Sequence, residues 1–268
     1  MSTLEAILLG AVQGLTEFIP VSSSGHLVLV PEALGWGEPG LSFDVMLHVG
    51  SLIALLIYFS GDLLDLARGF LAGDKSSRRM VALLAIGTMP AVVAGLALAD
   101  FFEEQFKDEG AAAIQLLFTA AILVGAEQVL RFHEKRTARI GRSLRKMDDL
   151  RTPDALTIGA AQALSILPGI SRSGATIAAG LALSVERDDA ARFSFLLAIP
   201  ALVGATILEV PELAGSSLGF GAAIGGFLAS LVTSYAAIWG LIRYLKTNTL
   251  YPFAIYCVIA SIFFLLIL

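Results

Sequence analysis

A polar cluster stands near the start of the sequence, in the segment QGLTEFIPVSSSGH. A glutamine and a glutamate four residues apart share one face of a helix and could hold a divalent cation through their oxygens. The serines and the histidine that follow are candidate nucleophiles, bases or phosphate ligands. The alternatives are a solvated acid at a helix end and a packing histidine. The cluster consists of Gln13, Glu17, Ser22, Ser23, Ser24 and His26.

A second cluster lies in PGISRSGAT, residues 168–176, where Arg172 is the only Lys, Arg, Asp or Glu between Ala155 and Val185. A guanidinium is planar and can bind a phosphate through two N–H groups. The surrounding residues suit a loop that cradles an oxyanion, with a helix N-terminus behind it. The alternative is an ion pair with Glu17 that only fastens the two segments together. The other members are Gly169, Ser171, Ser173, Gly174 and Thr176.

An anion clamp, a metal carboxylate, hydroxyls and an imidazole together favour phosphoryl chemistry, in which catalysis is mostly positioning and charge stabilisation. Asp44 and His48 are also four residues apart. They either support the ligands of the site or only satisfy each other.

The composition indicates which kind of protein must position these residues. Of the 268 residues, 56% are hydrophobic and 15% are charged, and the mean hydropathy is +0.80. These values predict an integral membrane protein. The net charge of −5 and the confinement of basic residues to particular loops exclude a nucleic-acid-binding class. Six spans are expected, at about 41–59, 80–99, 111–130, 193–210, 218–242 and 249–268.

The charges of the connecting segments predict the topology. Basic residues gather in 60–79, 131–151 and 243–246, whereas 99–110 and 209–217 are acidic. The positive-inside rule places the basic segments in the cytoplasm and the acidic ones outside.

Two segments remain, 4–40 and 155–186, and each must begin and end on one side of the membrane. Each is interrupted, at Pro20 and at Pro168-Gly169. Non-helical backbone at membrane depth is tolerated only where protein or a watery cavity satisfies it. We therefore expect two re-entrant helical hairpins that enter from opposite sides, with a site between them.

The two hairpins are also related in sequence. A shift of 149 residues gives seven identities in the 16 positions from 10 to 25. The expected fold is thus an all-α, single membrane domain over 1–268. Inverted-topology repeats occupy about 1–130 and 152–268, joined by the basic cytoplasmic loop 131–151. Such repeats place their site near the bilayer midplane.

The same motifs, with RFSFLLAIPALVGA and YPFAIY further on, resemble the bacterial undecaprenyl-diphosphate phosphatases associated with bacitracin resistance. The family signature E/Q-x-x-x-E matches Gln13 to Glu17, and P-G-x-S-R-S-x-x-T matches Pro168 to Thr176. The resemblance implies six spans and two re-entrant hairpins. It also implies removal of the terminal phosphate of undecaprenyl diphosphate, which recycles the lipid carrier for peptidoglycan and other envelope polymers.

The resemblance implies roles for the site residues. Arg172 would clamp the diphosphate, while Glu17 and Gln13 would position Mg²⁺ or Ca²⁺. Gln13 replaces a second glutamate of some members and removes one negative charge. Ser23 would be the nucleophile with His26 as base; alternatively, His26 attacks phosphorus or activates water. The remaining substrate-binding candidates are Ser22, Ser24, Ser171, Ser173, Gly174 and Thr176.

The resemblance further implies a multi-pass protein of the bacterial inner (plasma) membrane, with its site facing the periplasm among membrane lipids. A homodimer is compatible with the sequence, which carries no information on oligomeric state. The competing function is a transporter or flippase of a polyprenyl phosphate lipid, because inverted repeats with broken helices are typical of transporters.

Overall fold

The computed structural model describes residues 1–37, 40–106, 108–213 and 219–268. Within them the regular secondary structure is helical, apart from one isolated bridge between Arg145 and Val185. The helices are α1 (Thr3–Phe18), α2 (Ser23–Ala33), α3 (Leu41–Tyr58), α4 (Ser60–Ala72), α5 (Lys75–Ala97), α6 (Ala99–Gln105), α7 (Glu109–Arg139), η1 (Met147–Asp149), α8 (Thr152–Leu164), α9 (Arg172–Ala182), α10 (Arg187–Leu213), α11 (Phe220–Leu245) and α12 (Tyr251–Ile267).

The six expected spans coincide with helices α3, α5, α7, α10, α11 and α12. Among the described residues, four of them (α5, α7, α10 and α11) are long and apolar enough to cross a membrane alone. Helix α3 passes the same test together with α4, from which it is bent by 69°, and α12 is an apolar helix of 17 residues. The chain is therefore an all-α, multi-pass integral membrane protein.

The connecting segments contain more helix than the charge pattern predicts. Segment 60–79, expected as a basic loop, forms α4 and the first turn of α5. The basic loop expected at 131–151 begins later, because α7 continues to Arg139. With 31 residues, α7 is about 46 Å long and exceeds a hydrocarbon core of about 30 Å. The short α6 occupies part of 99–110.

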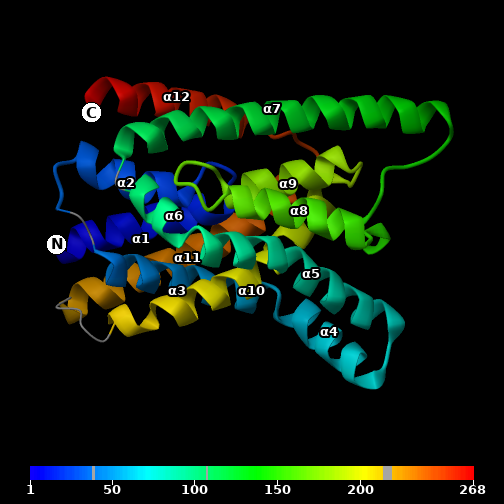
Figure 1. Ribbon diagram of the computed structural model, residues 1–268, viewed down its shortest axis with the longest axis horizontal. Helices are drawn as coiled ribbons and strands as arrows, with labels where there is room; N and C mark the ends of the chain where they lie inside the picture. The colour runs from blue at the N-terminus through cyan, green and yellow to red at the C-terminus, as the bar shows by residue number, and fades with distance from the viewer. Residues whose placement is uncertain (38–39, 107, 214–218) are drawn as a thin grey trace.

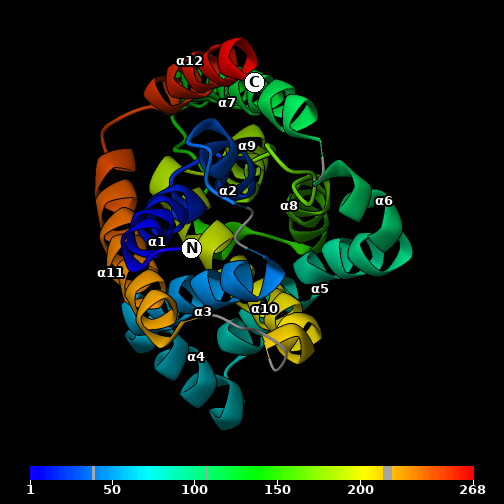
Figure 2. The ribbon, with the colours of Figure 1, turned by 90° about the vertical axis from the view of Figure 1, so that its left-hand side faces the viewer.

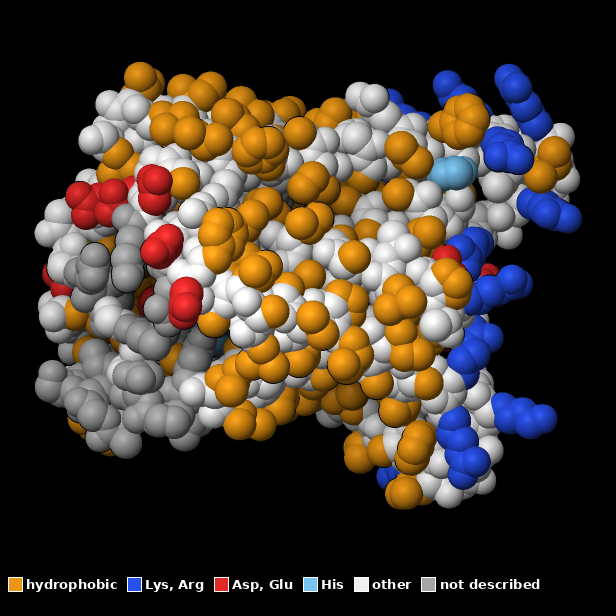
Figure 3. All heavy atoms as spheres, viewed as in Figure 1, with side chains coloured by type: hydrophobic (Ala, Val, Ile, Leu, Met, Phe, Trp, Pro, Cys, Tyr) orange, Lys and Arg blue, Asp and Glu red, His pale blue; other side chains and the backbone are white. Residues whose placement is uncertain are grey.

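Charged side chains separate to the two ends of the molecule. Figure 3 shows Lys and Arg side chains gathered at the right-hand end, with a few Asp or Glu side chains among them, and a group of Asp and Glu side chains at the left-hand end; hydrophobic side chains cover much of the surface between them. This separation agrees with the predicted orientation of the basic and acidic segments. Parts of several predicted regions lie outside the described residues. They are 38–39 at the end of the first hairpin segment, 107 and 214–217 in the expected outer segments, and 218 at the start of an expected span.

The two predicted re-entrant segments form broken helical hairpins. Helices α1 and α2 lie toward the left-hand end in Figure 1, whereas α8 starts and α9 ends toward the right-hand end. Figure 2 shows the four hairpin helices in the middle, surrounded by the longer helices. The breaks fall at 19–22 and 165–171, the segments that contain Pro20 and Pro168. Proline disrupts the helix there because it lacks an N–H donor.

Each hairpin packs against a helix from the other half of the chain. Helix α1 packs chiefly on α11, and α8 packs chiefly on α5. A Cβ atom added at Gly10 would lie 2.2 Å from the carbonyl oxygen of Gly226, and one added at Gly159 would lie 2.1 Å from that of Gly87. Gly10 and Gly159 are equivalent under the 149-residue shift. The matched contacts support the inverted-repeat interpretation.

Candidate active site between the hairpin tips

The breaks of the two hairpins meet in the interior of the protein. A Cβ atom added at Gly25 would lie 3.0 Å from the Cα atom of Gly169, and one added at Gly174 would lie 3.4 Å from Cβ of Pro20. The hydroxyl of Ser173 donates a hydrogen bond of 3.4 Å to the carbonyl oxygen of Ile19. The tips are therefore in direct contact, as the topology predicts.

Two serines cap the helices that start at the tips. The hydroxyl of Ser22 accepts the backbone N–H of Gly25 at 3.3 Å, and that of Ser171 accepts the N–H of Gly174 at 3.0 Å. The caps begin α2 and α9, whose N-termini lie at the meeting point of the hairpins. Helix N-termini carry free N–H groups and positive partial charge, and both favour an anion.

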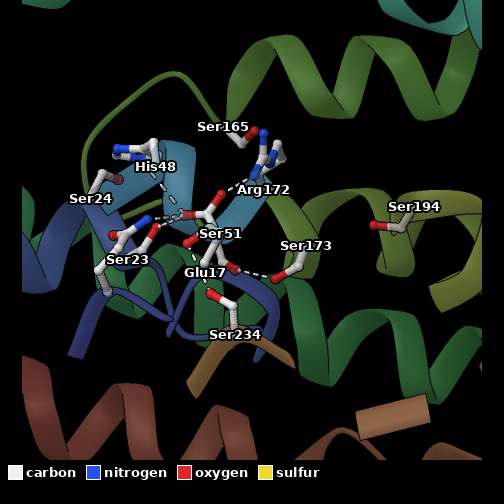
Figure 4. A network of polar contacts seen from close by, with 12 residues as sticks. Glu17, Ser23, Ser24, His48, Ser51, Ser165, Arg172, Ser173, Ser194 and Ser234 are labelled. Carbon is white, nitrogen blue, oxygen red and sulfur yellow. Dashed lines mark hydrogen bonds and ion pairs between the residues drawn. The ribbon is translucent and has the colours of Figure 1, made fainter. Parts of the chain in front are cut away.

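Glu17 is the centre of the polar network, shown in Figure 4. Its Oε2 atom accepts a hydrogen bond of 2.5 Å from the hydroxyl of Ser23 and one of 2.9 Å from the side-chain amide of Gln13. Its Oε1 atom accepts from Arg172 of the second hairpin. Glu17 and Gln13 are buried. The solvated helix-end alternative for Glu17 is therefore wrong, and the carboxylate joins the two halves of the site.

Arg172 forms the ion pair that the sequence offered as an alternative to anion binding. A guanidinium carries five N–H donors, and within the described residues its hydrogen bonds go only to Glu17. Its side chain keeps 20% of its surface exposed, against 4% for Glu17. Donors therefore remain for a phosphate, and the pair does not preclude the predicted clamp.

His26 lies beside the site with both ring nitrogens engaged. Its Nδ1 lies 2.7 Å from the carbonyl oxygen of Ser22, and its Nε2 lies 2.8 Å from the hydroxyl of Tyr256 on α12. The ring also stacks on Tyr256, at 5.7 Å between centroids. In this arrangement His26 has no hydrogen bond to Ser23, which donates to Glu17 instead. A role of His26 as base therefore stays a prediction that requires it to release Tyr256.

The remaining predicted residues support the tips. The hydroxyls of Ser22 and Ser24 are 3.3 Å apart, and those of Ser171 and Ser173 are 3.2 Å apart. Thr176 instead turns toward α10, where its hydroxyl lies 2.5 Å from that of Ser194. The Thr176 hydroxyl thus links α9 to α10 and does not point to the phosphate that Arg172 would bind.

His48 of α3 lies at the site, although the sequence analysis offered it only as a support for the ligands or as a partner of Asp44. Its Nε2 atom lies 3.8 Å from Oε2 of Glu17, and its Nδ1 atom lies 2.8 Å from the carbonyl oxygen of Asp44. The spacing of Asp44 and His48 was the only signal for it, and the contact uses the backbone of Asp44. That α3 approaches Glu17 follows from the packing of α3 against α1 and α11.

Oxygen atoms suited to a divalent cation are present beside Glu17. Oε1 of Gln13 is buried and has no hydrogen-bond partner among the described residues. Within the same residues, no group of three or more His, Cys, Asp or Glu side chains could by itself hold a metal ion. A cation here would therefore take ligands from Glu17, Gln13 and the substrate. Mg²⁺ sites with few carboxylates and with phosphate ligands are built this way.

The comparison with known families decides the relationship. A family described as "Bacitracin resistance protein BacA" matches residues 6–263, which include both hairpins and all the site residues named above. The chain belongs to the BacA family. The match covers nearly the whole chain, so it relates the complete two-hairpin arrangement to the family rather than one motif.

Curated relatives agree with this BacA assignment. A protein of Gloeobacter violaceus named "Undecaprenyl-diphosphatase" is 42% identical over 94% of this chain and 87% of its own length. Proteins of the same name from Methanosphaera stadtmanae and Thermomicrobium roseum are each 38% identical. Those alignments cover 98% and 100% of this chain and 96% and 98% of the relatives.

Proposed function

We propose that this protein hydrolyses undecaprenyl diphosphate to undecaprenyl phosphate and inorganic phosphate. The observation that carries the proposal is Glu17, which contacts a hydroxyl nucleophile on one hairpin and a guanidinium on the other. The name shared by the BacA relatives supplies the substrate. The apolar outer surface suits the polyprenyl tail, and the polar tips suit the diphosphate.

Binding of the diphosphate depends on Arg172 and the two helix N-termini. The substrate brings negative charge that competes with Glu17 for the guanidinium. Arg172 then holds phosphate oxygens, while backbone N–H groups at the starts of α2 and α9 complete the cradle. Donors fixed before the reaction stabilise the charge that develops in the transition state without reorganisation.

Ser23 attacks the terminal phosphorus in the proposed mechanism. Its hydroxyl already donates to Glu17, so the proton moves to this carboxylate as the Ser23 Oγ–P bond forms. The bond between phosphorus and the bridging oxygen breaks, and undecaprenyl phosphate leaves with the proton that Glu17 took from Ser23. Water then attacks the phosphorus of the phosphoserine while the Glu17 carboxylate takes one of its protons. The Ser23 Oγ–P bond breaks, Glu17 returns this proton to Ser23 Oγ, and inorganic phosphate leaves. Direct attack by Nε2 of His26 would first require this nitrogen to release the hydroxyl of Tyr256.

Glu17 and Oε1 of Gln13 would hold a divalent cation, Mg²⁺ or Ca²⁺. Such an ion supplies positive charge that neutralises phosphate oxygens. The neutral amide of Gln13 makes fewer charges available than a second carboxylate would, so phosphate ligands contribute more to the affinity for the cation.

The protein would work in the bacterial plasma membrane, with the site open toward the periplasm. The charge separation in Figure 3 supports a basic cytoplasmic end and an acidic outer end. Hairpin α1–α2 begins at that acidic end and brings Glu17 and Ser23 inward.

The decisive experiment is phosphate release from undecaprenyl diphosphate by the purified protein in detergent, with and without EDTA. We expect release that EDTA suppresses and Mg²⁺ or Ca²⁺ restores. Release that EDTA does not change would remove the cation from the proposal. No release from folded protein would overturn hydrolysis, and lipid-phosphate flux across vesicles would then be measured.

A further inference from the structure

His48 adds an imidazole to the site from an element outside both hairpins. It projects from α3, and its Nε2 atom is the ring nitrogen nearest to Glu17, 3.8 Å from Oε2 (Figure 4). This distance is too long for a hydrogen bond. The side chain is 30% exposed, against 4% for Glu17. The imidazole is therefore more accessible than the carboxylate that it faces.

The hydrogen bond on the other side of the ring defines the tautomer of the neutral imidazole. The carbonyl oxygen of Asp44, 2.8 Å from Nδ1, can only accept. Nδ1 must carry the hydrogen, so the lone pair of Nε2 faces Glu17. Histidines that bind metals show the same arrangement, with the second nitrogen donating to a backbone carbonyl or a carboxylate.

The spacing of these donors suits one shared ion. Nitrogen and oxygen ligands lie about 2.0–2.2 Å from a first-row divalent metal, so two of them on one ion are roughly 3–4 Å apart. The Nε2–Oε2 distance of 3.8 Å falls in this range. Gln13 donates to the same Oε2 through Nε2, and its Oε1 lacks a partner among the described residues.

We propose that Nε2 of His48 is a direct ligand of the divalent cation, together with Glu17 and Gln13. The inference rests on the cation dependence in the proposed function and goes beyond it, because it predicts which cation the site prefers. An alternative is a protonated His48 that serves only as a counter-ion. A protonated His48 would be expected to donate a hydrogen bond from Nε2 to Glu17, but the 3.8 Å separation is too long for one.

A nitrogen ligand changes metal selectivity. Ca²⁺ and Mg²⁺ favour oxygen donors, whereas imidazole suits later first-row metals. We expect Mn²⁺ and Co²⁺ to bind more tightly than Ca²⁺ in the absence of substrate. Replacement of His48 by glutamine, which offers an amide oxygen, should reduce this preference.

The test is pulsed electron paramagnetic resonance of Mn²⁺ bound to the full-length protein in detergent, without lipid substrate. We expect a ¹⁴N coupling from a directly bound imidazole. His48→Gln should abolish the coupling and weaken Co²⁺ binding at least about tenfold. His133→Gln, which changes a histidine of α7 far along the sequence from the site, is the matched control and should alter neither.

Bound Mn²⁺ without a ¹⁴N coupling would overturn the proposal, and so would failure to bind Mn²⁺. A coupling that persists in His48→Gln would also overturn it. The wild-type spectrum alone can refute the inference if the variant does not fold. Because the spectra need no turnover, a negative result leaves phosphate release to be judged separately. Phosphate release that EDTA suppresses, without a ¹⁴N coupling, would leave the proposed hydrolysis intact and would rule out only His48 as a ligand of the cation.

Discussion

The two hairpins use one backbone plan for different chemistry. Ser22 and Ser171 are equivalent under the 149-residue shift, and both cap the N–H of an equivalent glycine. The first helical residue after each cap differs, being Ser23 in one hairpin and Arg172 in the other. Both reach the same carboxylate, Glu17. The symmetry therefore accounts for the shared backbone, and the departures from it place Ser23, the proposed nucleophile, and Arg172, the proposed clamp.

The two equivalent glutamines, Gln13 and Gln162, differ in their hydrogen-bond partners. Gln13 bonds Glu17, whereas its equivalent Gln162 is buried with both side-chain amide atoms unpartnered among the described residues. The position equivalent to Glu17 is Ile166. Without a carboxylate there, the second hairpin cannot repeat the network of the first.

The breaks also differ in backbone strain. Ser22 has a φ of +68°, a left-handed conformation that is unfavourable for a residue with a Cβ atom. Its equivalent Ser171 has a φ of −68°. The second break places its positive φ, +93°, on Gly169. Strain at functional residues often accompanies positioning, and here it lies directly before Ser23.

The largest expected effect comes from Ser23→Ala, which removes the chemistry of the first hairpin. Turnover should fall by about 10³-fold or more, because the attacking oxygen is lost. Phosphate release in detergent measures it. Ser76→Ala, at an exposed position near the start of α5, is the matched control and should leave turnover unchanged. Substantial turnover in Ser23→Ala would show that serine is not the nucleophile.

Arg172→Gln breaks the contribution of the second hairpin. Turnover should fall by about 10²–10³-fold, because the helix N-termini still attract the diphosphate. Arg243→Gln, at the end of α11, removes an equal charge away from the tips and should leave turnover unchanged. Near-normal turnover in Arg172→Gln would contradict the clamp.

Gly169→Ala tests the backbone of the second break. The added Cβ atom would lie 2.3 Å from the carbonyl oxygen of Ala112, and φ is +93°. The free energy of unfolding should decrease by about 2–4 kcal/mol. Thermal unfolding in detergent would detect it. Gly204→Ala, where no atom lies within 4 Å, is the control. Equal stability of the two variants would disprove the close approach.

Ser22→Gly tests the first break with the opposite sign. Glycine adopts a positive φ without strain. As an N-cap it is less favourable than serine by only a few tenths of a kcal/mol. The variant should therefore be more stable by about 1 kcal/mol. A lower melting temperature for Ser22→Gly would show that the serine cap outweighs the strain.

The smallest effect concerns the starts of the hairpins. Burial raises the pKa of Asp154, but hydrogen bonds from Arg145 and from the Arg151 N–H bring it below its usual range. The stabilisation is present above the unfolded-state pKa of about 3.9 and is lost as pH falls through the lower folded value. Asp154→Asn should flatten the loss of stability below about pH 4. Glu5→Gln, in the exposed cap of α1, is the control. Identical pH profiles would contradict the pairing.

Sequence reasoning predicted the hairpins because the charges of the neighbouring loops place both ends of each proline-broken segment on the same side of the membrane. It also predicted that Glu17 and Arg172 belong together. It missed α4, because the charged residues of this helix were interpreted as a loop. It also missed the extension of α7 to Arg139. It could not place His48 against Glu17, since that contact depends on how α3 packs beside the tips. The hydrogen bond of His26 to Tyr256 joins residues 230 apart and has no local signal.

The packing of each hairpin against the other half of the chain has a consequence for biosynthesis. Helix α1 leaves the ribosome among the first residues, but α11, on which it packs, is made near the end. At about 5–20 residues per second, Gly226 follows Gly10 by roughly 10–45 s. Throughout that interval α1, which carries Glu17, lacks its packing partner α11. For most of the same interval Arg172 has not yet been made. The first hairpin is therefore made well before the helix on which it packs, and a chain truncated before α11 should leave α1 without its main packing partner.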